Sequence, residues 1–346
     1  MSIAAKGKEV YIRVGHRFSK SIGAYGVLGG RSFDCPVDVA WDSNERLYVL
    51  NRPEGNVRIT VLDFEENYYH EFVRPGTQDG QLTWPSCIAV DADDVLYVSD
   101  QHTHRISLFS TEGTFLGKWG TEGSADGELK EPSGLAFDTS GDLYVVDTGN
   151  NRVQKFSKDG RLLLKWGSKG SDDGQFDMPW GIALDQENNV YVADWHNDRI
   201  QKFTPEGEFL MAVGSSGSGD GQLQRPAGVA IDRGGDIYVA DWGNDRVQVF
   251  DPKGTYQLKF TGDAMLSKWA LEILLADPAF LRERHKATLE PERRLWHPSS
   301  VKVDSHDRIF ISDTNRHRLQ VYEKETVTVD AEWIDLENPL REIQER

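Results

Sequence analysis

Prolines recur with a period of 47 residues through the middle of the chain, and this period constrains the fold more than any other feature. They lie at Pro36, Pro85, Pro132, Pro179, Pro226 and Pro298. Most copies then follow one order: an apolar run ending in Asp, a turn, a second apolar run ending in Asp, a run led by Arg, and a closing run. A period of this length is typical of repeat folds. A residue present in every copy is explained by the repeat, and a departure from the pattern marks a candidate functional residue.

One period contains four short strand-like runs. In the third copy they are residues 135–138, 142–147, 152–156 and 162–167, with Gly141 and Gly160 among the turn residues between them. Apolar and polar residues alternate along 152–156, as expected for a half-buried strand. Four antiparallel strands form one blade of a β-propeller, and blades bury their faces by stacking around an axis. The sequence therefore predicts an all-β fold, a six-bladed β-propeller of four-stranded antiparallel blades.

The predicted blades cover the chain from residue 33 to 324 with one interruption. Their approximate bounds are 33–82, 83–129, 130–176, 177–223, 224–262 and 296–324. The last blade shows only three strands, so its fourth strand must come from elsewhere in the chain. Residues 9–15 are expected to close the ring in this way, and residues 327–330 are the alternative. Residues 325–346 are otherwise expected to form a C-terminal tail.

Composition argues against several classes of partner. The net charge of −17 repels nucleic acid phosphates and anionic membrane surfaces, so we expect neither as a partner. No apolar stretch approaches the roughly 20 residues that span a bilayer, and the first residues lack the apolar core of a secretory signal. Cys35 and Cys87 are the two cysteines, too few for a disulfide scaffold. We therefore expect a cytoplasmic protein.

Two copies carry a family resemblance. Residues 147–156 (Asp-Thr-Gly-Asn-Asn-Arg-Val-Gln-Lys-Phe) and 241–250 (Asp-Trp-Gly-Asn-Asp-Arg-Val-Gln-Val-Phe) resemble the NHL repeat, as do the Asp-Gly-Gln loops at 173–175 and 220–222. The resemblance covers about residues 33–324 and implies a propeller. It implies little about function, because propellers of this family serve as lyases, sensors, RNA-binding modules and protein scaffolds.

Most charged residues belong to the repeat and are predicted to be structural. An Asp and an Arg five positions apart recur in five blades, where we expect ion pairs that brace a loop: Asp100/Arg105, Asp147/Arg152, Asp194/Arg199, Asp241/Arg246 and Asp313/Arg318. His104 and His317 stand where NHL repeats commonly carry histidine, and they are interpreted as structural too.

Departures from the repeat gather in loops that are expected to meet at one mouth of the central channel. These loops precede each proline or join the second and third strands of a blade. Two residues after the proline, three blades carry Gly134, Gly181 and Gly228, whereas the others carry Asp38, Cys87 and Ser300. The remaining departures are Arg52, His102, Trp195, His196, Trp242 and Arg316, together with Trp84, Trp180, Trp296 and His297 beside prolines.

These residues predict a ligand pocket with an aromatic wall and a cationic side. The ligand-binding candidates are Arg17, Trp180, Trp195, His196, Trp242, His297 and Arg316, and the catalytic candidates are Asp38, Arg52 and His102. Small-ligand sites are mostly apolar with a few convergent polar groups, and the planar guanidinium of arginine suits a carboxylate. Packing between blades is the alternative role of each tryptophan. Cys87 is interpreted as a small buried residue, with a nucleophile activated by His102 as the alternative.

Three of the rim histidines are candidate ligands of a divalent metal such as Zn or Ca. His102, His196 and His297 come from blades 2, 4 and 6, roughly threefold around the axis. A three-histidine zinc site needs such convergence, with each nitrogen about 2.1 Å from the metal. Rim residues of a six-bladed ring can stand too far apart for that distance, so the sequence leaves the metal open.

An insertion precedes the last blade. Pro226 and Pro298 are 72 residues apart, 25 more than the period. We expect residues 263–295 to form a helical lid over the channel, with one helix after Asp263 and another from Asp277. The loop from Gly15 to Pro36 is also long, and it is expected to bring Arg17 to the same mouth.

Among enzymes, the layout resembles peptidyl-hydroxyglycine amidating lyases, which are six-bladed and carry NHL-like repeats. Ser86, Trp180 and Ser299 stand here at the positions of that family's zinc histidines, which argues against the same zinc-dependent reaction. Arg52 matches an arginine that those lyases use for the substrate carboxylate. We expect a small, carboxylate-bearing organic ligand at the channel mouth, and lyase- or hydrolase-type activity stays open. The alternative is a non-enzymatic protein- or peptide-interaction scaffold.

Overall fold

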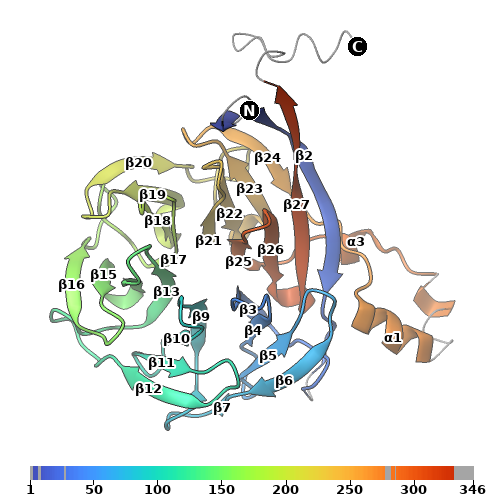
Figure 1. Cartoon of the computed structure of the whole chain (residues 1–346), viewed down its shortest axis with the longest axis horizontal. Coiled ribbons are helices and arrows are strands. Elements are labelled where there is room, and N and C mark those ends of the chain that lie inside the picture. Colours follow the sequence, from blue (N-terminus) through green and yellow to red (C-terminus); the bar gives the residue numbers. More distant parts are fainter. Residues whose placement is uncertain (1–2, 7–8, 27–28, 277–281, 285, 331–346) are drawn as a thin grey trace.

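Six β-sheets stand around a central axis as the blades of a propeller in the computed structural model, which describes residues 3–6, 9–26, 29–276, 282–284 and 286–330 (Figure 1). The innermost strands are β3 (Pro36–Trp41), β9 (Pro85–Val90), β13 (Pro132–Phe137), β17 (Pro179–Leu184), β21 (Pro226–Ile231) and β25 (Pro298–Val303). Each begins at a repeat proline, which lacks an N–H donor and therefore suits the first residue of a strand. The predicted six-bladed fold is confirmed.

Three further strands complete each blade. The second strands are β4 (Leu47–Asn51), β10 (Leu96–Asp100), β14 (Leu143–Asp147), β18 (Val190–Asp194), β22 (Ile237–Asp241) and β26 (Arg308–Asp313). The third strands are β5 (Arg58–Leu62), β11 (Arg105–Phe109), β15 (Arg152–Phe156), β19 (Arg199–Phe203), β23 (Arg246–Phe250) and β27 (Arg318–Asp330). The outermost strands are β6 (Tyr68–Phe72), β12 (Phe115–Trp119), β16 (Leu162–Trp166), β20 (Phe209–Val213), β24 (Tyr256–Phe260) and β2 (Glu9–Ile22). Strands β7 (Arg74–Pro75) and β8 (Gln81–Leu82) form a small parallel pair before blade 2.

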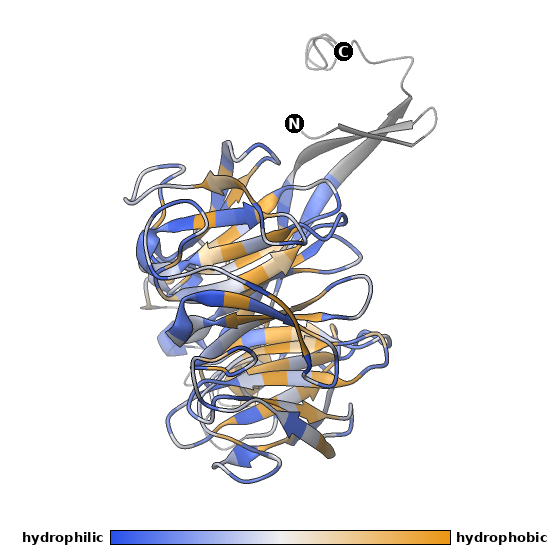
Figure 2. Cartoon of the chain, turned by 90° about the vertical axis from the view of Figure 1, so that its left-hand side faces the viewer, coloured by the Kyte–Doolittle hydropathy of each residue, from blue (hydrophilic) through white to orange (hydrophobic). Residues whose placement is uncertain are grey.

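Hydrophobic seams between neighbouring blades form the core. Strand β14 is buried along its whole length because blades cover both of its faces, whereas β16 alternates between half-buried and exposed residues. At the seam between blades 3 and 4, Tyr144 and Val146 pack with Ile182 and Phe203. Figure 2 shows the hydrophobic residues in the strands and the hydrophilic ones mainly in the turns.

The amino-terminal strand closes the ring, but with different residues from those predicted. Strand β27 continues past the blade to Asp330, and β2 pairs with it antiparallel over its whole length. Residues 18–22 therefore lie beside 319–322, the part of β27 within the blade, and residues 9–15 pair with 325–330. The two segments predicted as alternatives are thus partners of each other. Strand β1 (Ile3–Lys6) adds a fifth strand to this sheet, and residues 331–346 of the predicted tail lie outside the described residues.

A polar network on one buried Asp repeats from blade to blade. In blade 4, the fully buried Asp194 accepts the backbone N–H of Asp177 (2.8 Å). It also accepts hydrogen bonds from the side chains of Asn197, Arg199 and Gln201 (2.9, 3.0 and 3.0 Å). Arg199 in turn donates to two backbone carbonyls of the loop that enters the blade. The network ties the end of the second strand to that loop.

The predicted Asp–Arg ion pairs form in blades 3 to 6 at 2.7–3.0 Å, but blade 2 departs from this prediction. There Asp100 accepts four backbone N–H groups, and Arg105 donates to three loop carbonyls. The loop N–H groups satisfy this carboxylate in place of the guanidinium. In blade 1, Asn51 takes the acceptor role and bonds the Asp34 N–H at 3.0 Å.

The described part of the insertion does not cover the channel as the predicted lid. Helix α1 (Lys268–Ala276) lies outside the ring in Figure 1, beside the junction of blades 6 and 1. Trp269 is 1% exposed there, packs against Phe33, and donates its ring N–H to the carbonyl of Glu66 at 2.8 Å. The apolar seam between the two blades offers Trp269 more contact than an open channel would. The second helix was predicted from Asp277, and residues 277–281 lie outside the described residues.

The end of the insertion returns to the ring. Helix α3 (Glu290–Arg293) runs into β25, and Arg318 donates to the backbone carbonyls of Glu292 and Arg294 (2.6 and 3.2 Å). In other blades the equivalent arginine makes the same contacts with the loop that enters the blade, as Arg199 does in blade 4. Neither α1 nor α3 is long and apolar enough to cross a membrane, and the same holds for every helix within the described ranges.

Candidate functional site

The loops predicted to meet at one mouth do lie at one end of the propeller. Pro132 pairs with Asp147, and Asp147 pairs with Arg152, so the start of the first strand lies beside the loop between the second and third strands. The other NHL-like blades repeat this register. We call this end the mouth face.

An unbroken row of aromatic rings crosses the mouth face over blades 4 to 6. The ring centroids of Trp180 and Trp195 are 5.4 Å apart, and those of Trp195 and Trp242 are 5.1 Å apart. Trp242 stacks on His297 at 4.1 Å with an interplanar angle of 17°. His297 is followed by Trp296 at 6.2 Å, and Trp296 is 43% exposed. Four predicted ligand residues are therefore brought together, and we call these five residues the aromatic row.

A groove of about 730 Å³ lies at the outer end of the aromatic row, between blades 5 and 6 and the end of the insertion. It is lined by Asp245, Thr261, Pro291, Arg294, Leu295, Trp296 and Arg316. The guanidinium of Arg316 lies 5.2 Å from the centroid of the Trp296 ring and donates to the Pro291 carbonyl at 2.6 Å. Its Nε is buried without a hydrogen-bond partner. This volume is typical of sites for small organic ligands.

A second arginine on the mouth face lies at the other side of the ring. Arg52 stacks over Trp84, with 4.8 Å from its guanidinium carbon to the ring centroid, and donates to the Pro85 carbonyl at 3.4 Å. Burial lowers the pKa of Arg52 to about 10, which still leaves the guanidinium charged at neutral pH. Arg52 is also close enough to Cys35 for the two side chains to interact electrostatically.

The central channel is almost closed near the mouth face. The first residues of the six innermost strands leave a volume of about 30 Å³ between them, which is on the order of one or two water molecules. A Cβ atom on Gly181 would lie 2.6 Å from the Ala227 carbonyl oxygen, so the glycines let the inner strands approach closely. An organic ligand at the predicted mouth therefore has little room to enter the channel, and the groove is the larger of these two hollows.

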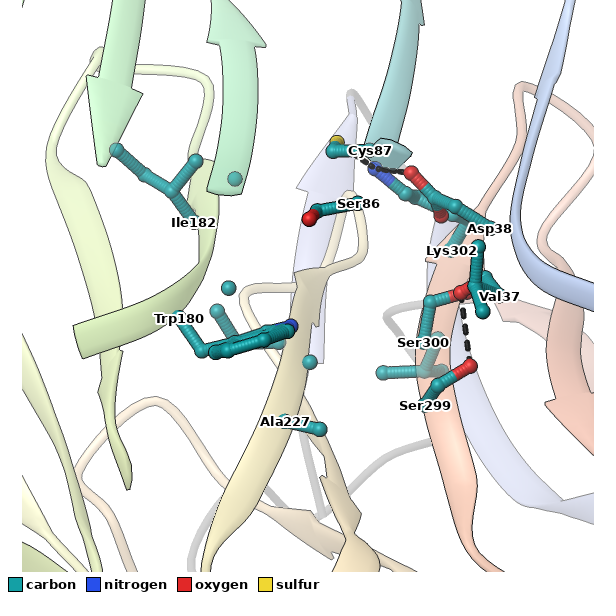
Figure 3. A pocket seen from close by; sticks show the side chains of 15 residues that line it. Val37, Asp38, Ser86, Cys87, Trp180, Ile182, Ala227, Ser299, Ser300 and Lys302 are labelled. Carbon is teal, nitrogen blue, oxygen red and sulfur yellow. Dashed lines mark hydrogen bonds and ion pairs between the residues drawn. The ribbon is translucent and has the colours of Figure 1, made fainter. Parts of the chain in front are cut away.

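A charged cluster fills one side of this channel. Lys302 comes from blade 6, with its Nζ 3.5 Å from Asp38 Oδ2 of blade 1 and 4.0 Å from Cys87 Sγ of blade 2 (Figure 3). Asp38 Oδ2 also accepts the Ile88 N–H at 3.0 Å, while its Oδ1 is buried without a partner. Burial opposes the charge of Lys302, but the carboxylate of Asp38 raises the pKa of Lys302 above its usual range.

Cys87 has the properties of an inert thiol. It is 5% exposed, and its sulfur accepts the Leu135 N–H at 3.3 Å. Burial, and then the charge of Asp38, raise the pKa of Cys87 far above its usual range. A thiol that stays protonated is a poor nucleophile. This arrangement favours the buried, structural interpretation of Cys87.

The three predicted catalytic residues have different surroundings. Asp38 lies in the channel with Lys302, Arg52 lies on Trp84, and His102 is exposed on the loop after β10. Arg17 on β2 forms ion pairs with Glu323 and Glu325 on β27. Those strands run away from the mouth face, so Arg17 lies far from the predicted pocket. The long loop does bring Tyr25 to the mouth face, where its ring lies 4.4 Å from that of His317.

The three predicted metal histidines do not converge within the described residues. His196 Nδ1 lies 3.6 Å from Asp177 Oδ1. His297 stacks on Trp242, and its Nδ1 is 2.8 Å from the side-chain amide nitrogen of Asn315. One other group in that part of the chain has three potential metal ligands within 4.8 Å of one another, namely Asp34, Cys35 and His317.

Sequence reasoning missed Lys302 although the repeat contained the signal. At its position in the innermost strand, the other blades carry Ala40, Ala89, Ala136, Ala183 and Ala230. A lysine where the other five blades carry alanine departs further from the repeat than most of the candidate site residues do. Asp245 and Arg294 were missed as well. Arg294 lies in the insertion, where no second copy exists for comparison.

The sequence of the chain matches the NHL repeat family at residues 82–109, 129–156, 176–203, 223–250 and 295–322. Each match spans the first three strands of one of blades 2 to 6. The protein is therefore a six-bladed β-propeller in which blades 2 to 6 carry NHL repeats. Blade 1 lies outside the matches, and it differs by having Asn51 in place of Asp and seven positions rather than five from there to Arg58.

Similarity to individual proteins is more limited. A stretch of 98 residues is 30% identical to the protein brain tumor of Drosophila melanogaster, and this match covers 28% of the chain but 9% of that protein. A protein of unknown function from Bacteroides thetaiotaomicron superposes with a TM-score of 0.62 at 18% identity, covering 90% of this chain and 76% of that one.

Two other solved structures share the fold. An auxiliary nutrient binding protein from Bacteroides thetaiotaomicron has a TM-score of 0.60 at 14% identity, with 90% and 76% of the two chains covered. A catalytically inactive virginiamycin B lyase from Staphylococcus aureus, solved with quinupristin, has a TM-score of 0.55 at 11% identity over 89% of each chain. At these identities the similarity extends to the fold alone.

Proposed function

We propose that the protein binds a small, carboxylate-bearing organic molecule on its mouth face, in the groove between blades 5 and 6 and the insertion. The observation that carries this proposal is the convergence of two guanidinium groups and an exposed indole on one hollow of about 730 Å³. Arginine binds both oxygens of a carboxylate through its planar fork. The protein as a whole is strongly acidic, so this local pair of cations is what makes an anionic ligand favourable here.

The groove offers a partner for each part of such a ligand. Arg316 keeps donors free because its one hydrogen bond in this structure goes from one terminal nitrogen to the Pro291 carbonyl. Arg294 bonds Thr261 Oγ1 at 2.5 Å and pairs with Glu290, yet its side chain stays half exposed. Trp296 supplies an aromatic surface, and Asp245 supplies an acceptor for an amino group. An aromatic acid that also carries an amine matches this set best.

The test is a titration of a panel of aryl carboxylic acids and aromatic amino acids, followed by quenching of tryptophan fluorescence. Arg316→Ala is expected to weaken the best binder about 10- to 100-fold, because a charged hydrogen bond contributes roughly 1.5–3 kcal/mol. Arg161→Ala, an exposed arginine in the turn between β15 and β16, is the matched control and should bind like the wild type. Equal affinity of the Arg316→Ala variant would rule the groove out.

The aromatic row supports a second candidate function, the binding of a peptide segment of another protein. The row continues from the groove to Trp180 at the edge of the channel, which is longer than a small ligand needs. Aromatic-lined surfaces recognise extended peptides, proline-rich ones above all.

Selection of displayed peptides on the immobilised protein distinguishes this candidate from the first. Peptides that lie along the row are expected to lose at least about tenfold in affinity for Trp195→Ala, because truncating a central aromatic anchor typically removes 2 kcal/mol or more. The binding of small acids in the groove should not change in this variant. Failure to select any peptide, or selected peptides that bind the variant equally, would count against the scaffold function.

A further inference from the structure

The junction of blades 6 and 1 on the mouth face brings together a carboxylate, a thiol and an imidazole. Asp34 and Cys35 precede β3, and His317 follows β26, yet their potential ligand atoms all lie within 4.8 Å of one another. Asp34 Oδ1 is 3.4 Å from His317 Nδ1, and the same nitrogen accepts the Cys35 N–H at 3.0 Å. Asp34 is buried, and the other two side chains are half-buried.

Comparison with the other junctions shows which part of this arrangement the repeat explains. In four of the other five junctions, the residue equivalent to His317 accepts a backbone N–H from the next blade: His104 from Glu131, Asn151 from Met178, Asp198 from Arg225, and Asp245 from His297. All of these acceptors have a positive φ near 50°, which Asn, Asp and His tolerate better than other side chains. The imidazole of His317 therefore has a structural role that an amide or a carboxylate fills elsewhere.

The repeat does not explain Asp34 and Cys35. The equivalent pairs of residues before the other prolines are Thr83-Trp84, Lys130-Glu131, Asp177-Met178, Gln224-Arg225 and Trp296-His297. None of them combines a carboxylate with a thiol. The junction of blades 6 and 1 is also the place where the ring closes, because β2 joins blade 6 there and continues into the loop that leads to Asp34.

We propose that Asp34, Cys35 and His317 bind a zinc ion at the closure of the ring. This site is separate from the groove and does not depend on the function proposed for it. Thiolate sulfur, imidazole nitrogen and carboxylate oxygen are the three kinds of donor that zinc takes in proteins. On binding, the Cys35 thiol gives its proton to solvent and the thiolate becomes a ligand, while His317 Nδ1 releases the Cys35 N–H and gives its lone pair to the metal. Three protein ligands leave a fourth tetrahedral position for water.

Binding would hold the two ends of the ring together. His317 belongs to blade 6, and the other two ligands belong to blade 1, so a bound ion would add a further link to the hydrogen bonds and the ion pair that already join these two blades. The Tyr25 ring, 4.4 Å from that of His317, lies over the solvent side of the junction. Since a metal that binds only the folded state stabilises it, zinc should raise the melting temperature.

Cobalt provides a spectroscopic test on the full chain after treatment with a chelator. Titration with Co²⁺ is expected to give a thiolate-to-cobalt charge-transfer band in the near ultraviolet, and Zn²⁺ should displace it because zinc binds more tightly. The band should vanish in Cys35→Ser and persist in Cys87→Ser, the matched control at the second cysteine. No band in the wild type, or a band that survives Cys35→Ser, overturns the proposal.

His317→Asn separates metal binding from the structural role of this residue. Asparagine keeps an acceptor for the Cys35 N–H, as Asn151 Oδ1 does for Met178 at 2.8 Å in blade 3. We expect this variant to keep the melting temperature of the metal-free wild type and to bind zinc at least about tenfold more weakly. Unchanged zinc affinity in this variant would remove His317 from the site and with it the proposed ligand set.

Discussion

Replacing Lys302 with alanine is expected to lower the free energy of unfolding by about 3–5 kcal/mol. The substitution restores the residue found at this position in the other five blades, so the strand itself tolerates it. The loss arises because the substitution removes the cationic partner of Asp38, whose side chain is 3% exposed in the closed part of the channel. Chemical denaturation followed by tryptophan fluorescence measures the change.

Two further variants test this explanation. Asp38→Asn in the Lys302→Ala background removes the stranded charge and keeps an oxygen for the Ile88 N–H, so we expect most of the lost stability to return. Lys253→Ala, at an exposed turn, should change stability by less than about 0.5 kcal/mol. A Lys302→Ala variant as stable as that control would show that the channel cluster contributes nothing to folding.

Asp194→Ala is expected to lower the free energy of unfolding by a similar amount, about 3–5 kcal/mol. The substitution removes the centre of the polar network that repeats from blade to blade. The carboxylate accepts four hydrogen bonds, and its removal leaves the largely buried Arg199 guanidinium without its ion pair. Burial raises the pKa of Asp194 above its usual range, so these donors are what keep its charge inside the blade.

The matched control is Asp173→Ala, which removes the other acidic neighbour of Arg199. That carboxylate is 66% exposed and 3.8 Å from the guanidinium, so its removal should cost less than about 1 kcal/mol. Thermal and chemical denaturation of both variants give the comparison. Similar losses for the two substitutions would mean that burial of the repeat aspartate is not what makes the network stabilising.

The ring of blades could be predicted from the sequence because most of the six copies of the repeat show the same pattern. Each repeat proline begins a strand, and each Tyr-Val run belongs to a fully buried second strand. Both patterns depend on local geometry, so the sequence was enough to predict them. The closing strand was harder to place. Nothing in the residues at 318–322 shows that β27 continues to Asp330, and that continuation shifts the pairing of β2 by several residues.

Features without a second copy were predicted least well. The lid was inferred from helical spacing of apolar residues, but Met265 and Ile273 are exposed, and within α1 the buried residue is Trp269. A single large side chain in the seam between blades 6 and 1 decides where the helix lies, and no pattern in the sequence identifies that seam. Arg17 was misplaced for the same reason, because its position follows from the register with Glu323.

The candidate site was predicted in part. Five departures from the repeat on blades 4 to 6, Trp180, Trp195, Trp242, His297 and Arg316, do gather on the mouth face. Their surroundings could not be derived from the sequence, since the groove exists only where the insertion returns to the ring. Lys302 was also predictable, because alanine stands at the equivalent position of the innermost strand in the other five blades.

A crystal structure of the protein with the aryl acid that binds most tightly tests the central claim most directly. The proposed function predicts density for the ligand in the groove, with its carboxylate within hydrogen-bond distance of Arg294 and Arg316 and its ring on Trp296. Density for the ligand in the central channel, or at the end of the propeller opposite the mouth face, would contradict it.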